Sequence, residues 1–211
     1  MKGCLSFIIK TAAVILIIFG LKYLGIIDFV KDKIQERSSA PQAEKIEKAK
    51  DIVDLSEIGD EYIVDKNFKI LKTKVLLVQH SASGQKIAIF EPKEGKMFTK
   101  EDLKSPDVQQ KIDEFLKKNK NKLLQAENVE VVKQGNFEGL NQTIPYVRIR
   151  AELSGLPLKD IEGIASAAEL NNGKKLIIIA FAEKGKYSQI ITEAFAEKIK
   201  QPSAEYTQQN D

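Results

Sequence analysis

An apolar run at the amino end of the chain covers residues 5–30, with residues 11–21 as its uninterrupted centre. A helix needs about 20 mainly apolar residues to cross the hydrocarbon core of a membrane. Lys10 and Lys22 lie near the two ends of the run, where a lysine stem can follow the helix while its ammonium reaches the headgroups. The pattern therefore predicts a transmembrane anchor over residues 1–30.

A cleaved signal peptide is the competing interpretation, because Lys2 precedes an apolar centre of suitable length. Cleavage requires small residues, and residues 38–40 lie far downstream and precede Pro41, so we favour an uncleaved anchor. The lysine and arginine count on the carboxyl flank would keep the following chain in the cytoplasm. A short basic amino tail is instead typical of exported domains. We expect a single-pass protein of the cell membrane with its domain outside the cytoplasm.

A charged segment at residues 31–54 follows as a juxtamembrane linker. Within it, Ile46, Ala49 and Val53 form a narrow apolar stripe at helical spacing. The stripe fits either a stalk helix or the first packed helix, and it is too thin to decide between them.

From Phe68 the apolar period changes to that of strands. Asn172 and Gly173 form a strong tight-turn signal before a fully apolar run, and Gly84 ends a similar turn signal at residues 81–84. The strands that these patterns predict cover residues 74–79, 86–91, 129–133, 146–153, 163–169 and 176–182. A glycine-containing loop at 135–143 is expected to join the middle pair.

Helical spacing accounts for most of the rest. A short helical start at Thr99 and Asp102 precedes an amphipathic pattern at Val108, Ile112, Phe115 and Leu116, and a closing helix carries Tyr187, Ile191, Phe195 and Ile199. We expect Phe195, at the middle of the closing stripe, to pack on Ile177 or Ile179 of the preceding strand. Hairpins imply a mostly antiparallel sheet, and strands that are apolar on both faces imply helices on both sides. We expect an α+β fold, an α/β/α sandwich over residues 55–200, with a disordered polar tail at 201–211.

The carboxyl-terminal unit resembles a known group of proteins. Residues 171–174 (NNGK), the strand LIIIAFA, and Tyr187 and Phe195 on the final helix resemble the end of the PsbP-like and DcrB-like sandwich families. As an order of elements the likeness covers residues 68–199. It implies a largely non-catalytic, extracytoplasmic or assembly-associated domain, and it supplies no catalytic motif for numbered positions here.

Composition removes several classes of function. The chain has 33 basic and 30 acidic residues, a formal net charge of +3, which is too balanced for a dedicated nucleic-acid binder. Its one cysteine, Cys4, lies in the apolar run, so the domain has no cysteine for a disulfide, a zinc cluster or nucleophilic catalysis. We expect no cofactor and no metal site.

Tyr146, Arg148 and Arg150 form the best candidate contact surface. They alternate with Val147 and Ile149, and tyrosine and arginine are residue types that interfaces favour. The alternative is an ordinary exposed sheet face, or one covered by the stalk helix. We expect a protein partner for this surface.

Two further candidates are weaker. The lysine-rich helix end at Lys117, Lys118, Lys120 and Lys122 could grip anionic lipid headgroups, although a solvated helix end explains it as well. His80, with Ser81 and Ser83, could act as the base of a serine hydrolase, but sequence neighbours at a turn seldom reach that geometry. The sequence therefore predicts a membrane-anchored, non-catalytic binding module; an anionic-lipid sensor is the alternative and a hydrolase the weakest hypothesis.

Overall fold

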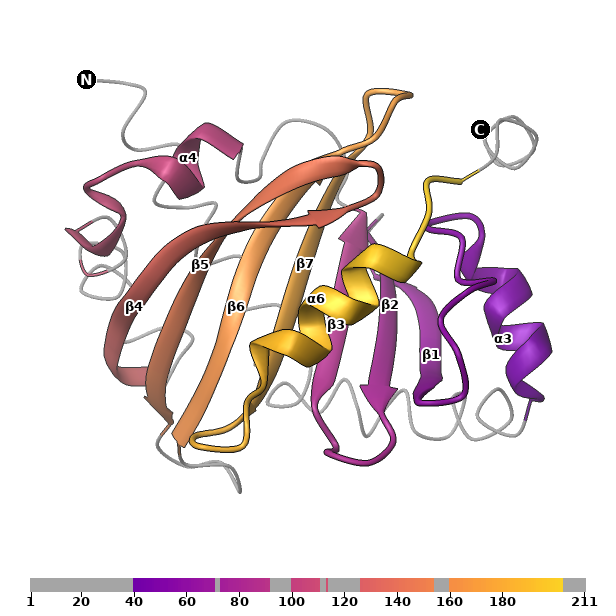
Figure 1. Cartoon of the computed structure of the whole chain (residues 1–211), viewed down its shortest axis with the longest axis horizontal. Coiled ribbons are helices and arrows are strands. Elements are labelled where there is room, and N and C mark those ends of the chain that lie inside the picture. Colours follow the sequence, from indigo (N-terminus) through magenta and orange to yellow (C-terminus); the bar gives the residue numbers. More distant parts are fainter. Residues whose placement is uncertain are drawn as a thin grey trace.

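The computed structural model describes residues 40–70, 73–91, 100–110, 113, 126–153 and 160–202. In these residues, seven strands form one sheet in the order β1-β2-β3-β7-β6-β5-β4, and every neighbouring pair is antiparallel (Figure 1). The predicted α+β class and antiparallel sheet are confirmed. The predicted anchor at 1–30 lies outside the described residues, among which no helix is long and apolar enough to cross a membrane.

The strands follow the chain as two groups separated by a short helix. They are β1 (Tyr62–Ile70), β2 (Thr73–His80), β3 (Lys86–Glu91), β4 (Ala126–Gly139), β5 (Gln142–Leu153), β6 (Asp160–Glu169) and β7 (Lys175–Glu183). The helices are α3 (Gln42–Ala49), α4 (Lys100–Lys104) and α6 (Gln189–Lys198). After β3, in the middle of the sheet, the chain passes α4 and reaches the far edge at β4.

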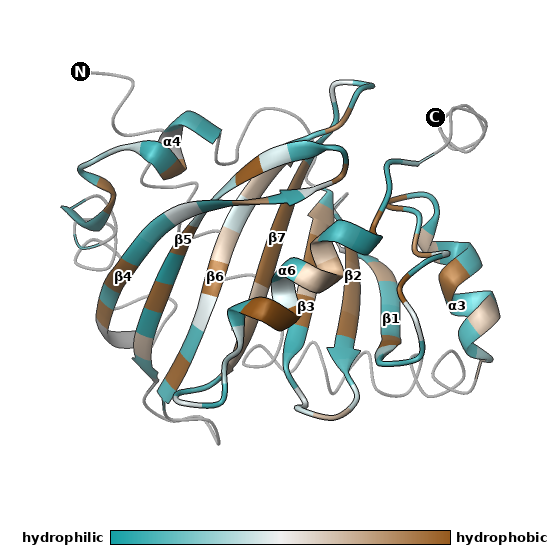
Figure 2. Ribbon diagram, in the orientation of Figure 1, coloured by the Kyte–Doolittle hydropathy of each residue, from teal (hydrophilic) through white to brown (hydrophobic). Residues whose placement is uncertain are grey.

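Both faces of the sheet are apolar, because side chains alternate between them along each strand. The face that packs against α6, here called the α6 face, includes Leu76, Ile89 and Ile178 together with Phe195 of the helix. The opposite face, here called the α4 face, includes Phe90 and Ile177 together with Leu103 of α4. Figure 2 shows the resulting hydrophobic colour of the central strands β3 and β7.

The closing helix packs where the hydrophobic stripe predicts, but on different strand residues. Phe195 is fully buried and shares a cluster with Ile178. The residues expected beneath it, Ile177 and Ile179, belong to the α4 face. The expectation was wrong, because neighbouring residues of a strand point to opposite faces and α6 covers the face of Ile178.

Strand β1 is not among the six strands that the apolar alternation predicts. The register of β1 against β2 shifts between Val64 and Lys66, so the alternation reverses within the strand. Val64 joins the α6 face, whereas Phe68, also at an even position, packs on the α4 face. A two-residue period cannot be recognised across such a bulge.

The loop expected at residues 135–143 is not a loop. From Lys133 and Arg148 onward, strands β4 and β5 pair residue by residue as far as Gly139 and Gln142, and the turn between them consists of Leu140 and Asn141. Both turn residues have positive φ, at 53° and 57°, as a tight hairpin of this kind requires. Gly135 lies opposite Tyr146, and an added Cβ would stand 2.6 Å from the tyrosine hydroxyl oxygen. The glycine therefore makes room for the Tyr146 ring.

Glutamine side chains occupy part of each edge of the sheet. On β1, the Gln42 amide accepts from Val64 N at 2.9 Å and donates to Val64 O at 3.0 Å. On β4, the Gln109 amide accepts from Val131 N at 2.6 Å and donates to Val129 O at 3.0 Å. Each amide imitates the pairing of a further strand, so these backbone groups are not available to another chain.

The amino-terminal part of the described chain is packed and is not a free stalk. Ala49 of α3 is buried, and α3 lies beside β1 (Figure 1). Ile52 and Val53, which the sequence placed in the linker, are fully buried on the α6 face. Asp54 and Lys200 exchange two backbone hydrogen bonds of 2.9 and 3.0 Å, which join the two ends of the folded unit.

Candidate functional site

Arg148 of β5 forms the most buried ion pair of the candidate surface. Its Nε and Nη2 atoms lie 2.9 and 2.7 Å from Oε1 of Glu162 on β6, a residue that is only 4% exposed. The guanidinium carbon also lies 5.3 Å from the centre of the Tyr187 ring. A buried carboxylate needs such a partner, because an unpaired charge in the interior is costly. Arg148 is therefore committed to contacts within the protein.

Arg150 has a different environment, although it is the residue directly opposite Glu162 in the strand register. Its Nε atom lies 3.5 Å from Glu162 Oε1, and its side chain is 42% exposed, against 26% for Arg148. On its other side the register partner is Glu130 of β4. The guanidinium of Arg150 is thus the looser and more accessible of the two.

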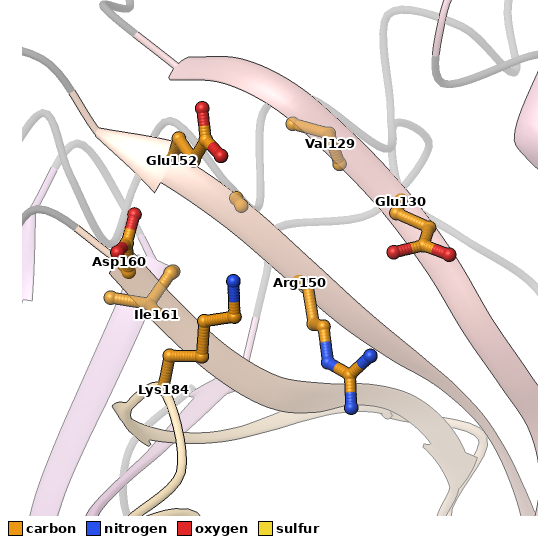
Figure 3. A pocket seen from close by; sticks show the side chains of 8 residues that line it. Val129, Glu130, Arg150, Glu152, Asp160, Ile161 and Lys184 are labelled. Carbon is orange, nitrogen blue, oxygen red and sulfur yellow. The ribbon is translucent and has the colours of Figure 1, made fainter.

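A pocket of about 240 Å³ lies at the end of the sheet where β5 stops and β6 begins. Its charged lining consists of Arg150, Lys184, Glu130, Glu152 and Asp160, and its apolar lining consists of Val129, Ala151 and Ile161. Figure 3 shows the Lys184 ammonium extending into the space between Asp160 and Arg150. The pocket therefore presents both signs of charge to solvent beside a small apolar wall.

The backbone explains how these charged groups come together. The register places Glu130, Arg150 and Glu162 in one row across β4, β5 and β6. Lys184 follows β7 directly, and its backbone N–H donates to Asp160 O at 3.0 Å, which fixes it at the start of β6. No sequence motif links these positions, because their proximity depends on strand register.

A separate apolar groove lies on the α4 face. Val129, Ala151 and Ile161 line both the pocket and the groove, and the groove has a volume of about 50 Å³. Its further walls are Ile149, Ala165, Ile179 and Phe181, with Gly163 on its floor. The side chain of Arg150 lies on the opposite α6 face, together with Arg148 and Glu162, so this guanidinium and the apolar groove are on different sides of the sheet.

Tyr146 does not belong to the exposed surface predicted for it. The residue is 2% exposed, its ring stacks on Phe137 at 6.0 Å between centroids, and its hydroxyl accepts from Gln189 Nε2 at 2.8 Å. The alternation along β5 was predicted correctly, but α6 and the long β4–β5 hairpin cover the tyrosine end of that face. The three residues predicted to form one contact surface therefore have different environments. Tyr146 is buried, Arg148 is paired with Glu162, and Arg150 is the more exposed arginine.

A buried polar network holds the start of α6 beside this site. Gln85, which is fully buried, donates to Ser188 O at 3.0 Å and to Thr192 Oγ1 at 2.9 Å, and accepts from Ser188 N at 2.8 Å. The hydroxyls of Tyr187 and Thr192 are 3.2 Å apart. Burial raises the pKa of Tyr187 to about 12, in spite of opposing effects from the Thr192 hydrogen bond and the Arg148 charge. The network positions Tyr187 against Arg148.

His80 lies at the end of β2, and its side chain supports the β2–β3 turn. Its Nδ1 atom accepts from Ser83 N at 3.2 Å and lies 2.9 Å from Ser83 Oγ, and its ring meets Tyr62 edge-on at 5.4 Å. The nearby carboxylate of Glu61 is ion-paired with Lys198, which together with its hydrogen bonds lowers the pKa of Glu61. The structure therefore gives His80 a turn-stabilising role.

The remaining predicted sites have different outcomes. Lys117, Lys118, Lys120 and Lys122 lie outside the described residues, so the lipid-binding prediction stays a prediction. Within the described parts of the chain, no three histidine, cysteine, aspartate or glutamate residues are grouped to hold a metal ion.

Comparison with known proteins gives no assignment. No known protein family matches the sequence, and no curated protein matches it significantly.

Proposed function

We propose that this protein is a membrane-anchored, non-catalytic binding module whose contact site is the pocket around Arg150 and Lys184. The observation that carries the proposal is the difference between the two neighbouring arginines. Arg148 is committed to Glu162 and Tyr187, whereas Arg150 lines an open pocket with exposed groups of both charges. Arginine in an accessible pocket is a frequent anchor of binding sites.

The membrane part of the proposal rests on the apolar run at residues 5–30, which is long enough to span a bilayer. Full-length protein is expected to stay with membranes after carbonate washing, whereas a chain starting at Gln42 is expected in the soluble fraction. Protease shaving of intact cells then reports on which side the domain lies; an extracytoplasmic domain is degraded. Release of the full-length chain by carbonate would contradict the transmembrane anchor.

The binding part is tested by site-specific photocrosslinking in native membranes. A benzophenone side chain at Glu130, an exposed residue of the pocket, is expected to crosslink to a bound molecule. The matched control is Glu138, which is exposed on the same strand but bonded to Thr143 near the hairpin turn. Adducts from position 138 alone, or from neither position, would contradict a binding site at this pocket.

The absence of catalysis is proposed on the geometry of His80. Its ring contacts the turn backbone and Tyr62, and the nearby carboxylate of Glu61 is paired with Lys198. The resemblance of residues 171–199 to the PsbP-like and DcrB-like families points in the same direction. Hydrolysis of a chromogenic ester that disappears in Ser83→Ala would refute this part.

A sensor of anionic lipid remains the second candidate, carried by the lysines of residues 117–122. Such binding is electrostatic, so it weakens as salt screens the charges. Pelleting of the chain from Gln42 onward with phosphatidylserine vesicles is expected to fall steeply with salt if this candidate is correct. Salt-independent pelleting, or none, would exclude it.

A further inference from the structure

We propose that one end of the sheet lies against the membrane that holds the predicted anchor. The inference rests on the anchor of the proposed function, and it adds the orientation of the domain and the surface that meets the lipid. This end, here called the α3 end, comprises the start of α3, the start of β1, the β2–β3 turn at residues 81–84 and the start of α6. The opposite end carries the β6–β7 turn at residues 170–174 (Figure 1).

Hydrogen bonds hold the four segments of the α3 end together. Gln42, the first residue of α3, is bonded to both backbone groups of the third residue of β1. Ser81 N donates to Glu61 O at 2.8 Å, which joins the β2–β3 turn to the start of β1. Gln85, directly after the turn, is bonded to both backbone groups of Ser188 at the start of α6. The four segments therefore form one contiguous end of the fold.

The linker between the predicted anchor and this end is short. Nine residues, 31–39, separate the anchor from Ala40, the first described residue. A chain of nine residues spans about 30 Å when fully extended, about 17 Å on average when flexible, and about 14 Å when helical. A nine-residue strand such as β1 is itself about 30 Å long. The opposite end reaches the bilayer only when the linker is stretched along the full length of the sheet, so the linker favours contact by the α3 end.

Exposed apolar side chains support the same orientation. The large hydrophobic residues that are exposed in the described parts of the chain are Ile190, at 77%, Ile63, at 41%, and Val132, at 36%. Ile190 is the second residue of α6 and Ile63 the second residue of β1, and Tyr62 Oη donates to Ile191 O at 2.8 Å between these two starts. Alternation places the two isoleucines on opposite sides of the sheet, at the rim of the same end. A flat apolar partner laid across this end meets both sides of the rim, as the interface of a bilayer does.

The charges at this end are of both signs and partly paired, so the contact requires no anionic lipid. Lys186 pairs with Glu183, and Glu61 pairs with Lys198. Lys184, which lines the candidate pocket, follows β7 at the same end, so a partner of that pocket is met close to the membrane surface. Salt screens only electrostatic contacts, so we expect this one to persist at high salt. That property separates it from the lysine-rich lipid candidate.

The test measures how close each end of the sheet comes to the lipid. The chain has a single cysteine, Cys4, so Cys4→Ser allows one fluorophore to be attached at a chosen position. Ala82→Cys, in the exposed β2–β3 turn, reports on the α3 end, and Lys175→Cys, at the exposed first residue of β7, reports on the opposite end. Full-length protein is placed in phosphatidylcholine vesicles that carry a quencher on the headgroup. Quenching is expected to be at least about threefold stronger at Ala82, because about 30 Å of strand separates the two ends.

A matched pair of variants tests the apolar contact. In the protein labelled at position 82, Ile190→Ser is expected to lower quenching at least about twofold, because the side chain that leaves water at the interface is lost. Val132→Ser makes a similar change at an exposed position in β4, away from the α3 end, and is expected to leave quenching unchanged. Thermal melting that matches wild type for each variant ensures that a change in quenching reports on orientation.

The outcomes distinguish this inference from the proposed function. Equal quenching at Ala82 and Lys175, or stronger quenching at Lys175, overturns the orientation. Quenching that high salt abolishes, or that Ile190→Ser leaves unchanged, overturns the apolar contact. A full-length chain that resists carbonate but shows either result contradicts only the inference. A chain that carbonate releases and that shows no quenching at either position contradicts both the anchor and the inference.

Discussion

Arg148 holds the buried carboxylate of Glu162 through two nitrogen atoms, at 2.9 and 2.7 Å from one oxygen, although Arg150 is its direct register partner. The diagonal neighbour in a sheet is within reach of a long side chain, and here it makes the closer contact. Arg150 is left 3.5 Å away with its side chain 42% exposed. The two arginines therefore differ in role although they are two residues apart on one strand face.

The first prediction follows from this difference. Arg148→Gln should lower the free energy of unfolding by about 3 kcal/mol, because it leaves Glu162 buried with only its weaker partner. Arg150→Gln should lower it by less than about 1 kcal/mol, since the Arg148 pair remains intact. Urea unfolding of both variants measures the difference. Equal losses would show that the arginines share the structural role, and the double variant Arg148→Met with Glu162→Met tests whether the loss comes from the orphaned carboxylate.

The second prediction concerns the edge of the sheet at β4. Gln109→Ala should cost about 1–2 kcal/mol and increase self-association, because Val129 O and Val131 N lose their partner at an open edge. Gln109→Glu is the matched variant: it keeps an acceptor for Val131 N, but its carboxylate cannot donate to Val129 O and repels Asp113, to which the Gln109 amide donates at 2.8 Å. Urea unfolding and sedimentation velocity report the two effects. A monomeric Gln109→Ala of wild-type stability would show that the glutamine does not protect the edge.

The third prediction compares two residues that contact the same tyrosine. The ring of Phe195 lies 5.1 Å from that of Tyr62 and is fully buried, so Phe195→Ala should cost about 3–5 kcal/mol. His80 also contacts Tyr62, but it mainly supports a turn, and His80→Ala should cost about 1 kcal/mol. Thermal melting ranks the two. The reverse order would mean that the histidine, and not α6, anchors this part of the core.

The fourth prediction is a dependence of stability on alkaline pH. Burial raises the pKa of Tyr187 to about 12, and burial with the Glu61 charge raises that of Tyr62 to about 12. An unfolded tyrosine has a pKa of about 10, so below that pH both states keep the proton and the contribution to stability is complete. From about pH 10 to 12 only the unfolded state loses it, so stability falls as pH rises.

Tyrosinate absorbance measures this directly. A late-titrating fraction is expected near pH 12, it should shrink in Tyr187→Phe, and it should disappear in denaturant. A titration curve that is identical in folded and unfolded protein would contradict the burial of both hydroxyls.

Most of the sheet could be predicted from periodicity, because β2, β3, β5, β6 and β7 keep one alternation from end to end. The Asn172–Gly173 turn was likewise predicted correctly, since Gly173 adopts a φ of 79° there. The failures share a cause. The bulge in β1 interrupts the alternation, and Gly135 in β4 is a residue type that is typical of loops. Only the pairing with the neighbouring strand shows that both positions lie within strands.

The candidate site was predictable only in part. Arg148 and Arg150 were identified by residue type and alternation, but nothing in the sequence distinguishes them. The distinction depends on Glu162 and Tyr187, which reach Arg148 through strand register and through the polar network that places α6. Lys184 and Asp160 were missed for the same reason, because their proximity is created by pairing between strands.

Under the proposed function, Arg150 is available to a ligand, whereas Arg148 is held by Glu162. Arginine occurs in this chain only at positions 37, 148 and 150, so modification by phenylglyoxal can be assigned to each one by peptide mass. In full-length protein in vesicles, Arg150 should react several-fold faster than Arg148, because Arg148 is held by Glu162. Equal rates at the two positions, or a faster reaction at Arg148, would contradict the account.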